Sequence, residues 1–138
     1  MRSALTIALL GWLAGTAWAD DKPVASGPLK AFKGPEGELI AMLDISDGKE
    51  MLVHFKNLGG ELEGKTLRYW VEDLGNGNKN IYVNVKHGSK TSRSNVLVAR
   101  EGRWSFYHPI KNLNFNLSYS EQASQQLTAR DVLKAYKP

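Results

Sequence analysis

Three histidines are the residues of this chain best suited to acid–base chemistry, and no cysteine is present. His54, His87 and His108 fall at or near the carboxyl ends of segments in which apolar and polar residues alternate. If neighbouring strands pair in simple succession, we expect those ends to meet on one edge of a sheet, with His87 and His108 about 10 Å apart. Imidazole titrates near neutral pH, so this pair would suit a general base and a general acid that cleave RNA without a metal ion.

The chain that follows His87 is rich in hydroxyl and cationic side chains. Residues 88–94 read Gly-Ser-Lys-Thr-Ser-Arg-Ser, and we expect them to form a loop on the same edge as Lys111. Hydroxyl and backbone N–H groups bind anions, and lysine or arginine adds positive charge. The catalytic hypothesis is therefore a small ribonuclease-like phosphodiesterase that uses His87, His108 and Lys90. The alternative is that each histidine caps or packs against a strand end.

Other site chemistries lack the residues that they need. Zinc requires three or four nitrogen or sulfur ligands, but the three histidines form no close-set pair and there is no cysteine. No Gly-x-Ser-x-Gly elbow marks a nucleophilic serine. Residues 75–79 contain two glycines but do not connect a strand to a helix, as a phosphate-binding loop would. We therefore predict no metal and no cofactor.

Charge is distributed unevenly along the chain, whose formal net charge is +4. Residues 20–75 contain 7 basic and 11 acidic residues, whereas residues 76–138 contain 10 basic and 3 acidic residues. A surface formed by the second part would attract phosphate, sulfate, lipopolysaccharide, teichoic acid or nucleic acid. The alternative is a basic face that only keeps the protein soluble. The cations that we assign to a binding surface are Lys86, Lys90, Arg93, Arg103 and Lys111.

Three aromatic residues lie on the polar side of the alternating pattern. Trp70, Tyr82 and Tyr107 each share a predicted face with charged or polar side chains. Because Trp70 and Tyr82 fall on the two strands of one predicted hairpin, they would be neighbours on its outer surface. Exposed rings next to amides and cations stack on sugar rings, on bases or against a partner protein. The alternative is burial of these rings under a helix that covers the same face.

The amino terminus predicts export. Residues 1–19 contain a basic residue, an apolar run and a small-x-small triplet that ends at Ala19. A membrane-spanning helix requires about 20 apolar residues, and this run is interrupted early by Asp20. We therefore predict a signal peptide cleaved after Ala19 and a periplasmic or secreted product; removing 19 of the 138 residues would leave 119. A chain of that length forms one domain and can be stable without disulfides.

The remaining chain predicts an antiparallel β domain. Residues 20–37 are punctuated by Gly and Pro and are expected to be an irregular lead segment before a single domain at 38–138. Asp47-Gly48 and Glu101-Gly102 are hairpin signals, because tight turns require positive φ. Alternation of apolar and polar residues predicts strands at 39–45, 51–56, 67–72, 81–86, 95–100, 103–108 and 112–119.

Helical spacing of apolar residues returns near the carboxyl terminus. It predicts a helix over at least 129–136, with a start as early as residue 120 as the alternative. The expected fold class is all-β: an antiparallel meander of six or seven strands that forms a sandwich or partial barrel, with one C-terminal helix. Two capping boxes compete to begin the helix, Ser118 with Glu121 and Thr128 with Asp131.

These features together favour binding over catalysis. We expect an exported, disulfide-free, non-catalytic domain that recognises an anionic polymer, an envelope component or a protein partner through a basic surface bearing aromatic rings. Inhibitor and immunity-type proteins belong to this class, and nucleic acid is a further candidate partner. The alternative is the two-histidine phosphodiesterase. None of the motifs is a family signature, so no function is transferred by resemblance.

Overall fold

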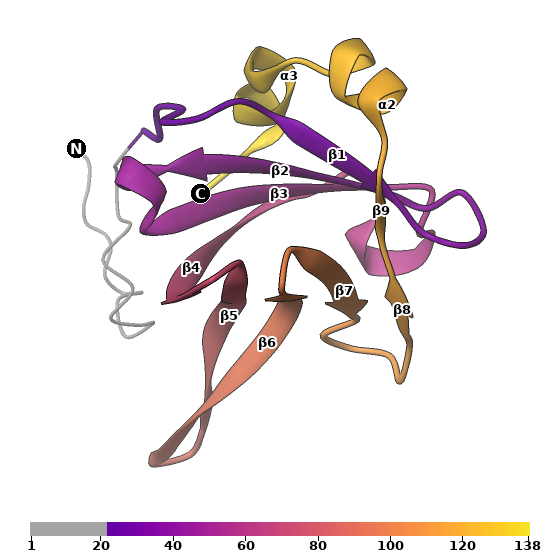
Figure 1. Ribbon diagram of the computed structural model, residues 1–138. Coiled ribbons are helices and arrows are strands. Elements are labelled where there is room, and N and C mark those ends of the chain that lie inside the picture. Colours follow the sequence, from indigo (N-terminus) through magenta and orange to yellow (C-terminus); the bar gives the residue numbers. More distant parts are fainter. Residues whose placement is uncertain (1–21) are drawn as a thin grey trace.

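The predicted all-β meander is confirmed by the computed structural model, which describes residues 22–138; the predicted export signal lies outside the described residues. Nine antiparallel strands pair mostly in chain order, so the sheet reads β8-β7-β6-β5-β4-β3-β2-β1-β9 (Figure 1). The strands are β1 (Lys30–Lys33), β2 (Leu39–Ile45), β3 (Glu50–Lys56), β4 (Thr66–Gly75), β5 (Asn78–His87), β6 (Lys90–Arg100), β7 (Arg103–Tyr107), β8 (Asn114–Asn116) and β9 (Ser118–Tyr119), with helices α2 (Glu121–Gln126) and α3 (Ala129–Ala135).

The sheet is nearly closed into a barrel, because one short stretch of chain pairs with both of its ends. β8 pairs with β7, and β9 pairs with β1. Between β8 and β9, Leu117 is buried, and its backbone N–H donates to the carbonyl of Trp104 at 2.9 Å. The single strand predicted at 112–119 is therefore divided, because the chain crosses there from one edge of the twisted sheet to the other.

Apolar side chains fill the inside of the barrel. Phe55 and Phe106 are completely buried with ring centroids 5.8 Å apart, and Phe115 of β8 lies 5.2 Å from Phe106. Because successive side chains of a strand point to opposite faces, alternate residues of each strand reach this core. They include Ile40, Met42, Met51, Val53, Tyr69, Ile81 and Leu97.

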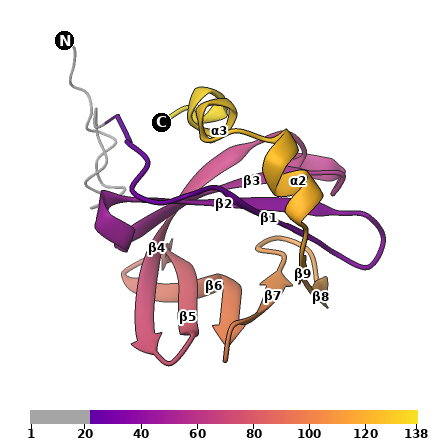
Figure 2. The ribbon, with the colours of Figure 1, turned by 45° about the horizontal axis from the view of Figure 1, so that its top comes forward.

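Two short helices cover the outer side of β1–β3, where one helix was predicted (Figure 2). Helix α3 begins with the predicted capping box of Thr128 and Asp131, which is confirmed. The box predicted at Ser118 is wrong, because Ser118 belongs to β9 and Ser120 caps α2 instead. Leu127 is extended and separates the two helices. The helices bury the outward residues Ala31, Leu39, Ala41, Leu43, Ile45 and Leu52.

The lead segment predicted at 20–37 is only partly irregular. Residues Lys30–Lys33 form β1, which pairs with β2 on one side and with β9 on the other. Ala31 points outward under the helices and Phe32 points into the barrel, and both are buried. A four-residue strand that is buried on both faces has no alternating pattern. The flanking Gly and Pro residues were then the only local signal, and they predicted an irregular segment.

Tight turns connect the strands, and one hairpin is longer than predicted. Asp47 and Gly48 adopt φ values of 55° and 84°, as the predicted β2–β3 hairpin requires. The loop predicted at 88–94 is wrong, because β5 continues to His87 and β6 begins at Lys90. Only Gly88 and the next residue form the turn, so the β5–β6 hairpin projects beyond the barrel (Figure 1).

Candidate binding surface

The outer faces of β4–β7 carry most of the predicted binding residues. The helices pack on β1–β3 and near the start of β4, so the far side of the barrel lies away from them (Figures 1 and 2). We call this side the outer basic face. Its outward side chains are Trp70, Glu72, Asn80, Tyr82, Lys86, Arg93, Arg100, Arg103 and Tyr107.

The predicted aromatic neighbours are paired across two strands. Trp70 of β4 lies directly opposite Tyr82 of β5 in the antiparallel register. Both side chains are half-buried, and Tyr107 on β7 is 42% exposed. The outer basic face therefore presents aromatic surface that is partly accessible, as a stacking contact requires.

Arg93 is oriented by two neighbours on this face. Its guanidinium carbon lies 3.6 Å from the centroid of the Tyr82 ring, and its Nη2 donates to Glu72 Oε1 at 2.6 Å. Asn80 Nδ2 donates to the same oxygen at 2.9 Å. The hydrogen bond from Asn80, followed by the charge of Arg93, lowers the pKa of Glu72. Glu72 therefore stays ionised and holds the guanidinium over the ring.

Two further arginines continue the row toward the β6–β7 turn. Arg100 donates to Asn80 Oδ1 at 3.0 Å and to the carbonyl of Lys79 at 3.2 Å. Arg103 approaches Glu101 at 3.5 Å in a pair that is almost fully exposed, so this pair contributes little to stability. A groove of about 410 Å³ on the same face is lined by Arg100, Arg103, Ser105, Tyr107 and Asn116.

The predicted cations do not all lie together. Lys86 lies on the outer basic face near the tip of the β5–β6 hairpin, whereas Lys90 pairs with His87 on the opposite face of that hairpin. Lys111 lies in the loop after β7, and its ammonium group is close to Gly60. A Cβ added to that glycine would lie 3.2 Å from Lys111 Nζ. Arg100, which was not among the predicted binding residues, belongs to the face instead. Only the cross-strand register distinguishes these positions.

The expectation that His87 and His108 converge is wrong. In the strand register, Phe106 of β7 lies opposite Leu97 of β6, and Leu97 lies opposite Ile81 of β5, so these three residues are at the same height in the sheet. His108 follows Phe106 by two residues, whereas His87 follows Ile81 by six. The remaining four residues extend His87 along the projecting hairpin by about 13 Å, in addition to the separation across one strand.

His108 has a capping role instead. Its Nδ1 accepts hydrogen bonds from the backbone N–H groups of Ile110 and Lys111, both at 3.1 Å. Its ring also meets Phe106 edge-on at 5.9 Å. His54 is likewise engaged, because its Nδ1 lies 2.8 Å from the hydroxyl oxygen of Thr66. These contacts match the capping and packing alternative for two of the three histidines.

Both engaged histidines make stability depend on pH. Burial, assisted by the charge of Lys111, lowers the pKa of His108, and burial, assisted by Lys56, lowers that of His54. A lowered pKa in the folded state means that the neutral ring is favoured by folding. This contribution is complete above the unfolded-state pKa of about 6.5 and is lost as pH falls through the folded-state pKa.

We therefore expect urea unfolding to show lower stability at pH 5 than at pH 7.5. His108→Ala should cost about 1 kcal/mol at pH 7.5, because two backbone donors would be left without their acceptor. His108→Asn retains an acceptor that does not titrate, so it should be more stable than the alanine variant and show a smaller loss at pH 5. Identical pH profiles for wild type and His108→Asn would contradict this role.

Within residues 22–138, no three His, Asp or Glu side chains are grouped so that they could hold a metal ion. Over that range, no helix has the length and apolar character needed to cross a membrane.

The fold and the site together define a nearly closed antiparallel barrel with one helix-covered side and one basic, aromatic side. Comparison with known proteins finds no relative: no family model, curated protein or solved structure matches the chain.

Proposed function

We propose that the protein is an exported, non-catalytic binding domain whose outer basic face binds an anionic polymer. The observation that carries the proposal is the row of Arg93, Arg100 and Arg103, which lies beside Tyr82 and Tyr107 on one side of the barrel. Guanidinium groups donate paired hydrogen bonds to phosphate, sulfate and carboxylate groups. The adjacent rings supply stacking surfaces for sugars or bases.

The shape of the face favours a polymer over a single small anion. β5 and β6 contain 10 and 11 residues, so the hairpin is about 33 Å long. Cations occur at three levels along it: Lys86 is next to the tip, Arg93 is two residues further from the tip, opposite Asn84, and Arg100 is at the base. A chain with repeated negative charges would contact all three levels at once, whereas a single anion would contact one.

The acidic residues of the face explain how binding would be selective. Glu72 and Glu101 already pair with Arg93 and Arg103. An incoming anion must compete with these carboxylates, so a weakly charged or isolated group would gain little. A polymer would replace several of these carboxylate–arginine pairs at once with its own anionic groups. It would also release the counterions bound along its chain, which makes its binding strongly dependent on salt.

The test is the variant Lys86→Gln/Arg93→Gln/Arg103→Gln on columns of immobilised polyphosphate and sulfated polysaccharide. We expect earlier elution than wild type, and a salt slope that decreases by about one for each phosphate group that the variant no longer neutralises. The matched control is Lys33→Gln/Lys49→Gln/Lys65→Gln, which removes the same charge from exposed positions elsewhere. Unchanged elution of the first variant, or equally early elution of both, would contradict the proposal.

The two-histidine phosphodiesterase is not proposed, because no observation favours it. His87 lies at the tip of the hairpin and His108 caps the loop after β7, so the two rings do not face a common substrate position. A general acid and a general base must both reach the same reacting group.

A further inference from the structure

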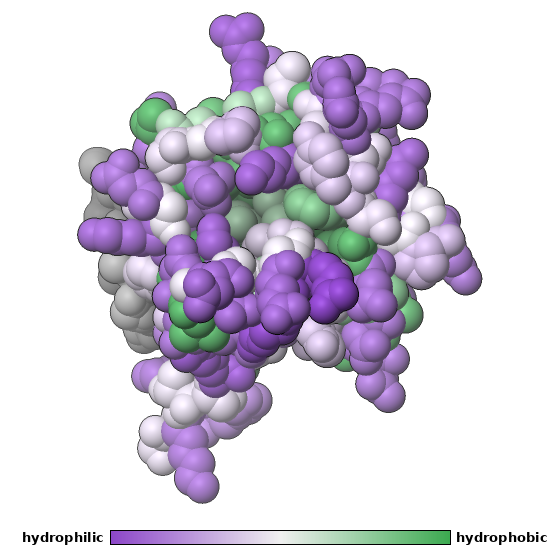
Figure 3. Space-filling view, in the orientation of Figure 1, coloured by the Kyte–Doolittle hydropathy of each residue, from purple (hydrophilic) through white to green (hydrophobic). Residues whose placement is uncertain are grey.

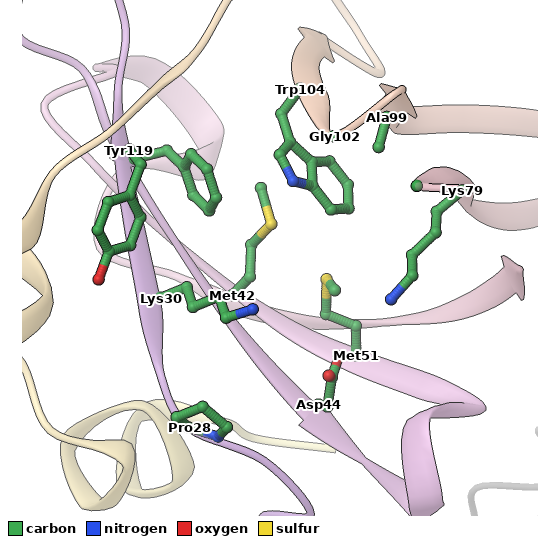
Figure 4. Close-up of a pocket in the computed structure, with 12 residues that line it drawn as sticks. Pro28, Lys30, Met42, Asp44, Met51, Lys79, Ala99, Gly102, Trp104 and Tyr119 are labelled. Carbon is green, nitrogen blue, oxygen red and sulfur yellow. The ribbon is translucent and has the colours of Figure 1, made fainter. Parts of the chain in front are cut away.

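One end of the barrel opens into a cavity that is separate from the outer basic face. The cavity has a volume of about 490 Å³ and lies among the start of β1, the β2–β3 end of the sheet, and the β4–β5 and β6–β7 turns (Figure 4). Its lining comes from inward positions, because Met42, Met51 and Ala99 belong to the faces that form the barrel core. Ligand sites have volumes of about 300–1,000 Å³ and favour the mouths of β-barrels.

The walls of the cavity are apolar and adaptable. Met42 and Met51 are 4% and 3% exposed, and Phe32 packs against Trp104 and Tyr119 at ring distances of 6.0 and 5.6 Å. The thioether and indole side chains are directed into a common space (Figure 4). In the space-filling view, apolar surface lies at the centre of this end with hydrophilic residues around it (Figure 3). Methionine side chains adapt to apolar ligands of different shapes.

Two cations occupy inward positions at the rim of this apolar space. Lys30 lies opposite Met42 and Lys79 lies opposite Ala99 in the strand register, so both side chains line the cavity. Neither ammonium group forms an ion pair with any residue in the described range 22–138. One carboxylate, that of Asp44, lines the same cavity, which leaves the rim with a net positive charge. Lys30 is exposed and Lys79 is half-buried, so both ammonium groups reach solvent at the mouth, where they can contact the charged head of a ligand whose apolar part lies deeper.

The rim is held in shape by a contact between two turns. The N–H of Gly102 donates to the carbonyl of Gly77 at 3.0 Å. A Cβ on Gly77 would lie 2.8 Å from that nitrogen, so the turns approach as closely as glycine allows. This contact fixes the two turns relative to each other, which reduces the ordering that binding would require.

We infer that this mouth binds an amphiphile with one hydrocarbon chain or small ring system and an anionic head. The apolar part would occupy the space between the two methionines and Trp104. The head, a carboxylate or a phosphate, would lie between Lys30 and Lys79. The two lysines that would bind the head do not belong to the outer basic face, and Trp104 is the one residue that lines both this cavity and the groove on that face.

The experiment measures four probes of equal chain length by isothermal titration calorimetry below their micellar concentrations. They are decanoate, decyl phosphate, decanol and decyltrimethylammonium. We expect both anions to bind about tenfold or more tightly than decanol, and the cation to bind most weakly, because charge-assisted hydrogen bonds form only with the anions. Decanoate and decyl phosphate separate a fatty-acid head from a phospholipid-like head.

The decisive variant is Lys30→Gln/Lys79→Gln, in which anion affinity should fall to that of decanol while decanol affinity stays constant. Its matched control, Lys49→Gln/Lys65→Gln, removes two exposed lysines that do not line the cavity and should bind as wild type does. Ala99→Leu, checked for folding by near-UV circular dichroism, should weaken anions and decanol alike by occupying the cavity.

Equal binding of all four probes, or unchanged anion affinity in Lys30→Gln/Lys79→Gln, would overturn the inference. A failure of polymer binding would not affect it, because neither lysine belongs to the outer basic face.

Discussion

Replacing Arg68 with methionine is expected to lower the free energy of unfolding by about 3–5 kcal/mol. Arg68 on β4 and Glu50 on β3 form an ion pair whose side chains are 2% and 8% exposed. Arg68 Nε donates to Glu50 Oε2 at 3.2 Å and Nη2 donates to Oε1 at 3.0 Å. Without the guanidinium, the carboxylate would stay in a buried setting that disfavours its charge.

The measurement is urea unfolding at pH 7.5. The double variant Arg68→Met/Glu50→Leu is the control, because it removes both charges and supplies apolar groups of similar volume. We expect it to recover much of the stability that the single variant lacks. If the double variant were as unstable as the single variant, the cost would arise from packing rather than from the remaining carboxylate. A cost below about 1 kcal/mol for the single variant would show that the pair is not structurally important.

Phe106→Ala should be comparably destabilising, by about 3–5 kcal/mol, for a reason based on packing. The Phe106 side chain is completely buried, and its ring lies within 5.8 Å of Phe55 and 5.2 Å of Phe115. It therefore connects β7 with β3 across the barrel and with β8 at the closing edge. Truncation would leave a cavity between these strands, and rigid sheet pairing would prevent them from moving inward to fill it.

Tyr107→Ala is the matched control for that substitution. Tyr107 is the next residue in β7, but its side chain points outward and is 42% exposed, so its removal should cost less than about 1 kcal/mol. Thermal unfolding of the two variants at equal concentration would compare them directly. Equal destabilisation by both would contradict the assignment of Phe106 to the core and of Tyr107 to the outer basic face.

Local patterns predicted much of this fold because their physical causes are local. Alternation identified the faces of β2, β3 and β4, since side chains change sides at every residue. Asp47-Gly48 and Glu101-Gly102 identified two turns, because each pair tolerates positive φ. The prediction failed at β1, which is too short to show alternation, and at residues 90–94, where polar side chains form a projecting strand rather than a loop.

The candidate sites were predicted only where they depend on adjacent strands. Trp70 and Tyr82 were predicted as neighbours because both belong to one hairpin, and their register confirms it. The distance between His87 and His108 depends on the length of the β5–β6 hairpin and on how β5 and β7 each pair with β6. Neither the length nor the pairing is encoded by a local sequence pattern. The cavity could not be predicted, because Lys30 fell in the lead segment and Lys79 in a predicted turn.

Residue patterns alone predicted the strand faces, the tight turns, the concentration of basic residues after residue 75 and the capping box of α3. The near closure of the sheet, the side that the helices cover and the set of cations that share a face became evident only from the folded chain. Periodicity and turn chemistry act over a few residues, so they are visible in the sequence. Closure, by contrast, depends on β8 and β9 meeting opposite edges of the same sheet, and this pairing joins positions far apart in the chain.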